Sequence, residues 1–204
     1  MSQQLHDVVV AGTAGGVGTT TVTALLFHAL RQAVGSTPRL LDHTYGVLAD
    51  RAPGWDALGP GDQGGGRLRL HDLGRHALIA GTARLADPGM RLVVVSAATP
   101  IGCALAQQCV ETVRRTHGAT GLGSTVVVLT GVFGRHRIRR LVLELPETQL
   151  LGIATIPDDL ALAAGSRIQP DRLSRRTRDA VGLVASLVTP SANESAQQSQ
   201  VRTG

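Results

Sequence analysis

The sequence predicts an α/β domain of three layers, in which a mostly parallel central sheet carries helices on both faces. Short apolar runs rich in β-branched residues alternate along the chain with stretches that repeat apolar residues at the helical period. Some of these runs, such as Leu92-Val93-Val94-Val95, are apolar throughout rather than alternating. Continuous apolar strands are typical of parallel sheets that are covered on both faces.

The expected elements follow one another in this alternating order. We expect strands at Asp7–Ala11, Arg39–Leu41, Arg67–Leu70, Arg91–Ser96, Thr125–Thr130 and Leu150–Ile156. We expect helices at Thr20–Val34, His76–Ala86, Ile101–Thr116, Arg137–Leu145 and Leu173–Val188. Residues Arg51–Gly66 contain three consecutive Gly and two Pro, so a long surface loop is expected there. A Ser/Gln-rich end follows, so we expect one domain over residues 1–188 and a disordered tail over residues 189–204.

Charge and composition narrow the functional classes. The chain has 204 residues and 20 basic side chains, all of them arginine, so no mechanism that depends on lysine can operate. A formal net charge of +5 suits an acidic partner, but it is also an ordinary charge for a protein that stays in solution. Cys103 and Cys109 form no metal or redox pattern, which indicates reduced core thiols. Without an apolar leader or a run of about 18 apolar residues, we expect a cytoplasmic protein with no transmembrane segment.

The strongest motif is a glycine-rich loop between the first expected strand and the first expected helix. It reads Gly12-Thr13-Ala14-Gly15-Gly16-Val17-Gly18-Thr19-Thr20-Thr21. A loop of this kind exposes backbone N–H groups at a helix N-terminus, where an anion such as phosphate is favoured. The loop resembles the deviant Walker A motif of the MinD/ParA family of P-loop ATPases. This resemblance implies a phosphate site at Gly15, Gly16, Val17, Gly18, Thr19, Thr20 and Thr21, with Thr20 as the magnesium ligand.

The loop departs from that family at the two positions that carry its lysines. Ala14 stands where the family has its signature lysine, and Thr19 stands where it has the Walker lysine. Each charge-assisted phosphate contact that is lost costs roughly 1.5–3 kcal/mol. The resemblance therefore implies the fold but argues against ATP hydrolysis. A glycine turn with no ancestry, a disabled site and a loop that still holds a phosphate group all remain open.

Two downstream acids extend the resemblance. Asp42 follows the second expected strand and matches the first acid of the family's Asp-x-Asp segment, whereas Thr44 replaces the second. Asp72 ends the third expected strand and resembles the Walker B-like acid, so Asp72 and Thr20 would hold magnesium if a nucleotide binds. Each acid is alternatively an ordinary residue of a turn. The fifth expected strand ends in Thr130 rather than in the family's adenine-reading Asn, while Ile156-Pro157 resembles the turn that lies by the base in the family.

Two arginine clusters are further candidates for binding. Arg135, Arg137, Arg139 and Arg140 form the denser one, and Arg172, Arg175, Arg176 and Arg178 form the other. Such side chains contact nucleic-acid phosphates or a protein partner, or they form a solvated face. No aromatic residue lies among them, which disfavours stacking on single strands.

Three functional hypotheses follow. The first is a non-catalytic MinD/ParA-like scaffold that positions or recruits a partner protein complex, similar to the degenerate CpaE/TadZ-like proteins of pilus localisation and secretion. Homodimerisation through the face around the glycine loop is implied by the same resemblance. The second is a switch that binds ATP or ADP with magnesium weakly, without efficient hydrolysis. The third is a DNA-binding partition or nucleoid-associated protein that uses the arginine clusters.

Overall fold

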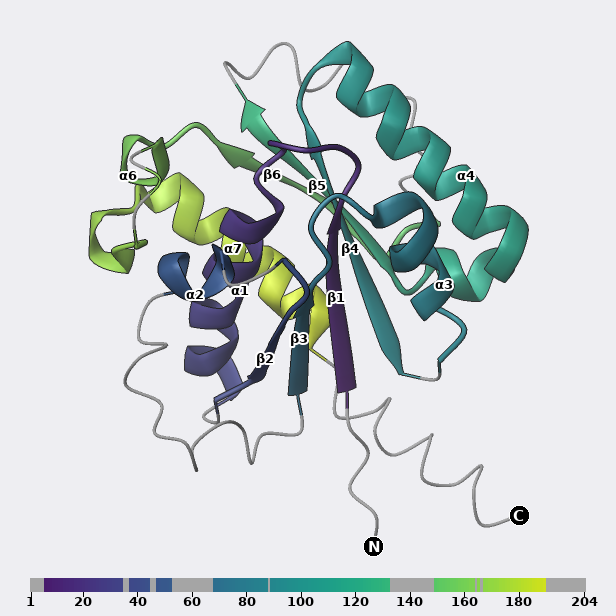
Figure 1. The fold of residues 1–204 in the computed structure, drawn as a ribbon, viewed down its shortest axis with the longest axis horizontal. Helices are drawn as coiled ribbons and strands as arrows, with labels where there is room; N and C mark the ends of the chain where they lie inside the picture. The colour runs from purple at the N-terminus through teal and green to yellow at the C-terminus, as the bar shows by residue number, and fades with distance from the viewer. Residues whose placement is uncertain are drawn as a thin grey trace, which may run out of the picture.

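The molecule is built around a parallel β-sheet of six strands (Figure 1). The computed structural model describes residues 6–34, 37–44, 47–52, 68–87, 89–132, 149–163, 165 and 167–189. The strand order within them is β2-β3-β1-β4-β5-β6, and all the neighbouring strands pair in parallel. The strands are β1 (His6–Gly12), β2 (Arg39–Asp42), β3 (Leu68–Asp72), β4 (Met90–Ala97), β5 (Thr125–Val132) and β6 (Gly152–Pro157). The predicted parallel sheet is therefore confirmed.

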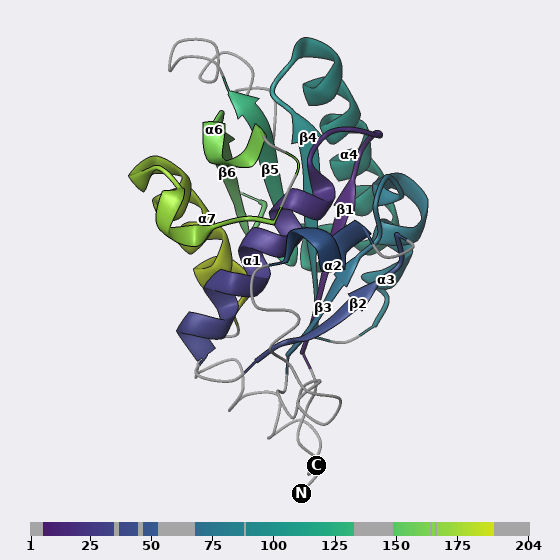
Figure 2. The same cartoon turned by 60° about the vertical axis from the view of Figure 1, so that its left-hand side comes forward.

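Helices cover both faces of this sheet and give the three predicted layers (Figures 1 and 2). Helices α1 (Thr19–Val34) and α7 (Arg175–Val188) lie side by side on one face. Helix α4 (Pro100–Leu122) packs against the other face. Among the described residues, no helix is both long enough and apolar enough to cross a membrane.

The strands supply an apolar surface to both helical layers. Val8 and Val10 of β1 pack in the core under α1 and α7, whereas Val9 and Ala11 pack in the core under α4. All four side chains are completely buried. Burying one valine side chain stabilises a fold by about 1.5 kcal/mol or more. The continuous valine runs seen in the sequence are thus explained, because neither face of the central strands meets water.

Helix α4 is longer than the sequence predicted. The expected helix ended at Thr116, but the chain continues in helical form to Leu122 through a kink at Gly118. Gly118 has φ +60°, a conformation that glycine adopts without steric cost. At the kink the ring of His117 hydrogen-bonds the Thr82 carbonyl over 2.9 Å, which ties α4 to the preceding segment. Cys103 and Cys109 are buried, as predicted, and no disulfide joins them.

The expected helix at His76–Ala86 is divided into two short pieces. A π-helical turn, η1 (Ala77–Gly81), is followed by the single turn α3 (Thr82–Arg84). Gly81 lies so close to the sheet that an added Cβ would stand 3.1 Å from the Cβ of Ala11. A wider helical turn accommodates this close approach to β1 better than a regular α-helix would.

The remaining elements are short. They are α2 (Val47–Arg51), which was not predicted, α6 (Leu160–Ala163) and the 3₁₀ turn η2 (Pro170–Arg172). The expected helix at Arg137–Leu145, most of the long loop at Arg51–Gly66 and the tail after Thr189 lie outside the described residues.

Candidate functional site

The glycine loop connects β1 to α1 at the carboxyl edge of the sheet. Gly16 and Gly18 have φ of 76° and 84°, values that favour glycine over any residue with a Cβ. Within the described part of the chain, no acceptor takes a hydrogen bond from the backbone N–H groups of residues 14–18. Backbone donors without acceptors at the start of a helix are suited to binding an anion.

Three neighbouring strands hold the loop in this shape. The Gly12 N–H donates to the Gly74 carbonyl after β3 (2.6 Å), and the Thr13 N–H donates to the Val95 carbonyl of β4 (2.9 Å). From β5, the Thr130 hydroxyl donates to the Val17 carbonyl over 2.7 Å. The loop is therefore organised by the protein's own hydrogen bonds.

The two residues at the lysine positions bring no charge to the loop. Ala14 is half-buried and packs against the core under α1. Thr19 is 6% exposed. A Cβ added to Gly12 would stand only 2.1 Å from the Thr19 hydroxyl oxygen. The Thr19 side chain thus packs beneath the loop, toward β1. Neither side chain can neutralise a phosphate.

Asp72, the predicted Walker B-like acid, is fully buried at the end of β3. Its Oδ1 accepts the Gly74 N–H over 2.8 Å, but no described residue hydrogen-bonds its Oδ2 with normal geometry. Burial raises the pKa of Asp72, although the Gly74 N–H and the nearby Thr20 hydroxyl lower it in part. The structure therefore brings the two predicted magnesium-binding residues, Asp72 and Thr20, together. An unpaired buried carboxylate beside a hydroxyl suits a hard cation with oxygen ligands.

Asp42 lies beside Asp72 in the sheet register but is engaged differently. Its Oδ1 accepts the Thr44 N–H (2.6 Å) and the Thr44 hydroxyl (2.5 Å), and its Oδ2 accepts the Leu48 N–H (3.3 Å). The carboxylate thus stabilises the turn that leads into α2. Thr44, which replaces the second acid of the family segment, serves as a partner for the first. The negative charge of Asp42 also helps to raise the pKa of Asp72.

A histidine pair behind these acids was missed by sequence reasoning. His43 and His71 stack with ring centroids 5.5 Å apart, and His43 Nε2 lies 3.3 Å from His71 Nδ1. His71 Nε2 lies 3.5 Å from a carboxylate oxygen of Asp7, which also forms an ion pair with Arg69. The net effect of burial, Asp7 and the nearby positive groups is to lower the pKa of His71, with burial the main cause. His43 directly follows Asp42, and His71 directly precedes Asp72. This adjacency to the two candidate acids was the sequence signal that could have identified the histidine pair.

The described residues contain no group of three or more His, Cys, Asp or Glu side chains placed to hold a metal ion. Any metal at Asp72 and Thr20 would therefore need oxygen ligands from water or from a bound phosphate, as magnesium accepts.

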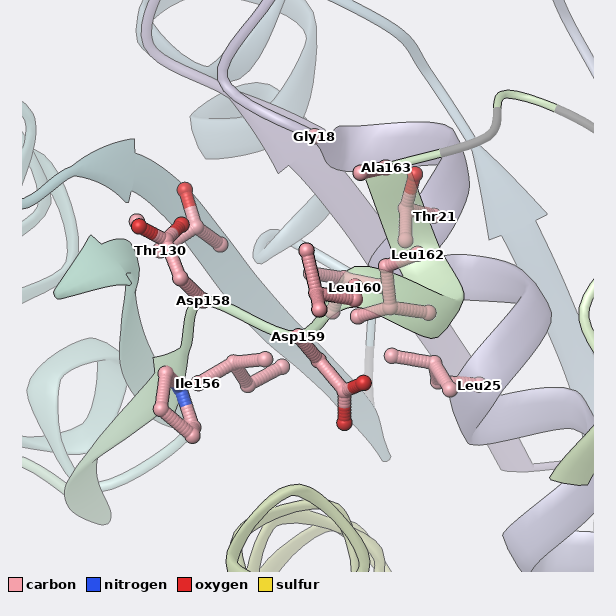
Figure 3. Close-up of a pocket in the computed structure, with 13 residues that line it drawn as sticks. Gly18, Thr21, Leu25, Thr130, Ile156, Asp158, Asp159, Leu160, Leu162 and Ala163 are labelled. Carbon is pink, nitrogen blue, oxygen red and sulfur yellow. The ribbon is translucent and has the colours of Figure 1, made fainter. Parts of the chain in front are cut away.

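A cavity of about 500 Å³ opens beside the glycine loop (Figure 3). It lies between α1, the end of β5 and the segment that joins β6 to α6, with Gly18, Thr130 and Pro157 among its lining residues. The turn after Ile156, which the family resemblance implies would lie by a base, lines this cavity. Asp158 and Asp159 both line the cavity.

Asp159 has a structural role in this turn. Its side chain points toward α7 in Figure 3 and accepts hydrogen bonds from the Ser174 N–H (2.8 Å) and the Thr177 hydroxyl (2.7 Å). Its other oxygen accepts the Ala161 N–H over 3.0 Å. Partial burial opposes ionisation, but these hydrogen bonds outweigh it and lower the pKa of Asp159. Asp159 therefore ties the cavity wall to the start of α7.

The structure describes only one of the two predicted arginine clusters. Arg135, Arg137, Arg139 and Arg140 lie outside the described residues. The second cluster is exposed on η2 and the first turn of α7, and within it Arg175 lies 3.6 Å from Asp179. A DNA-binding role for the first cluster stays a prediction.

Comparison with known proteins supports the fold. No protein-family model matches the sequence, and no curated protein matches it. Among solved structures, the chain is similar to a chain of the MinC:MinD cell division protein complex of Aquifex aeolicus, with a TM-score of 0.59, 16% identity and coverage of 89% of this chain and 94% of that one. It is also similar to a ParA family ATPase from Chlorobium tepidum TLS, with a TM-score of 0.57, 13% identity and coverage of 91% and 99%. The chain thus has a MinD/ParA-like P-loop fold.

Proposed function

We propose that this protein is a non-catalytic scaffold with a MinD/ParA-like fold, which positions or recruits a partner protein complex. The observation that carries the proposal is the glycine loop itself, which keeps its shape but has Ala14 and Thr19 at the two lysine positions. Thr19 is buried beneath the loop, so its side chain makes no contact with an anion above it.

The absence of the two lysines costs much binding free energy for a nucleotide and little for a protein partner. Two lost charge-assisted contacts, at roughly 1.5–3 kcal/mol each, take a micromolar site to about millimolar or weaker. Charge that develops during phosphoryl transfer would also lack its usual counter-charge. The loop shape, by contrast, depends on Gly74, Val95 and Thr130, so the surface around it needs no ligand to form.

The test measures phosphate release and partner capture by the wild-type protein. We expect no phosphate release by the wild type. We also expect affinity capture of its partner complex to be the same with ATP, with ADP and after enzymatic removal of nucleotide. Turnover by the wild type above a protein-free blank, or a partner that is retained only with ATP, would contradict the proposal.

A second candidate function is a nucleotide-binding switch that does not hydrolyse efficiently. It is favoured by the unpaired, fully buried Oδ2 of Asp72 beside Thr20, and by the cavity that adjoins Gly18. On this account, ADP and magnesium should stabilise the wild type together more than either does alone. The matched variant Asp72→Asn should lose the magnesium-dependent part only. A stabilisation by ADP that magnesium does not change would count against the switch.

A further inference from the structure

A second cavity, of about 440 Å³, lies on the outer side of the helical layer formed by α1 and α7. It is bounded by the C-terminal half of α1, by α7 and by the segment around η2. Leu25 lines both this cavity and the one beside the glycine loop, so the two cavities adjoin along one face of α1. Pockets that enclose small organic ligands have volumes of about 300–1,000 Å³, and this groove falls within that range.

Small residues form part of the apolar wall of the groove. Ala29 and Ala33 line it from α1, and Gly182 and Ala185 line it from α7. A Cβ added to Gly182 would meet nothing within 4 Å. No packing contact therefore requires glycine there, although glycine in a helix costs about 1 kcal/mol relative to alanine. Gly182 is exposed, so the space beside it is open to solvent and accessible to a ligand chain.

The polar groups at the groove are few and unevenly charged. Arg178 lines it from the first turns of α7 and is exposed, and no described residue forms a hydrogen bond or ion pair with its guanidinium. His28 is half-buried, and burial, with a further contribution from Arg31, lowers its pKa below the usual value despite the opposing charge of Asp171. Asp171 is the one acid among the described lining residues. Arg178 is thus the available permanent cation, and a planar guanidinium suits a carboxylate.

We propose that the groove between α1 and α7 binds a small amphiphilic anion, with its carboxylate head at Arg178 and its apolar chain over Gly182 and toward Ala33. The unpaired cation next to an apolar trough is the charge complementarity that selects this ligand class. The site lies farther along α1 than the glycine-loop cavity and shares only Leu25 with it, so its other lining residues belong to neither the loop nor that cavity.

The test uses decanoate as the probe and follows backbone amide resonances of the isotope-labelled full chain. Decanoate should shift the amides of α1 residues 25–33 and α7 residues 178–186. Gly182→Leu, which fills the groove, should abolish these shifts, whereas Ala104→Leu on the exposed side of α4 is the matched control and should not. Because the added side chain of Gly182→Leu enters open space, the variant should remain folded, and its spectrum will show this.

The head group is tested separately. Arg178→Gln should weaken decanoate binding about tenfold, the loss expected for one charge-assisted contact, and Arg115→Gln on α4 should leave it unchanged. Several results would overturn the proposal: no binding by the wild type, equal binding by Gly182→Leu, equal binding by Arg178→Gln, or equal affinity for a decyl chain with a trimethylammonium head.

Discussion

Replacement of Asp72 by asparagine should stabilise the ligand-free protein, even though it changes a residue of the candidate magnesium site. Asp72 is fully buried, and its Oδ2 has no hydrogen-bond partner among the described residues. Asparagine keeps the acceptor for the Gly74 N–H and places an N–H₂ group near the Thr20 hydroxyl, which can accept from it. A buried polar group without a partner costs about 1–3 kcal/mol, so we expect the free energy of unfolding to rise by about 1 kcal/mol near neutral pH.

The stability gain of Asp72→Asn should change with pH in a direction that can be measured. Burial raises the pKa of Asp72 in the folded state above its ordinary value of 3.8. The contribution of its carboxyl group to stability is therefore fully present below the ordinary pKa and is lost as pH rises through the raised pKa. The advantage of Asp72→Asn should thus be near zero in acid and should grow as the pH increases.

Asp159→Asn is the matched control because its shift has the opposite direction. The pKa of Asp159 is lowered from 3.8, so its contribution is present above that value and is lost as pH falls through the lowered pKa. Near neutral pH this variant should lose about 1–2 kcal/mol through its weakened hydrogen bonds. Urea unfolding from about pH 2 to pH 8 measures both variants. A marked loss of stability in Asp72→Asn near neutral pH would show that the buried Asp72 carboxylate does not destabilise the ligand-free protein. A gain that persists unchanged in acid would show the same.

Three further substitutions test the packing. Gly102→Ala should lose about 1–3 kcal/mol, because the added Cβ would stand 2.1 Å from the Ala97 carbonyl oxygen, and thermal unfolding should show a lower midpoint. Gly182→Ala should instead raise the midpoint, with a gain of up to about 1 kcal/mol, because its Cβ enters open space in a helix. Thr130→Val should lose about 1 kcal/mol in urea unfolding and speed hydrogen exchange at the glycine loop, because the Val17 carbonyl loses its donor. Unchanged exchange there would show that Thr130 does not hold the loop.

The sequence was sufficient for the sheet and for part of the site. The valine runs of β1 and β4 predicted strands buried on both faces, and the structure buries them completely. The carboxyl ends of neighbouring parallel strands meet at one edge, so the order of the glycine loop and Asp72 placed them together. The apolar runs and the order of the motifs along the chain are properties of the sequence itself. These features could therefore be predicted before the structure was known.

Contacts between distant side chains could not be read in the same way. Thr130 was seen only as the absence of an adenine-reading Asn, but its hydroxyl secures Val17, 113 positions away. The stacking of His43 on His71 depends on the pairing register of β2 and β3, which the sequence does not state. The extension of α4 through Gly118 was missed because a glycine at a positive φ usually ends a helix.

Calorimetric titration of the folded protein with ATP and ADP, with and without magnesium, shows directly whether the glycine loop binds a nucleotide. The account predicts no heat of binding at micromolar nucleotide for the wild type. Micromolar binding by the wild type would contradict it, since the backbone amides and other groups would then replace both lysines.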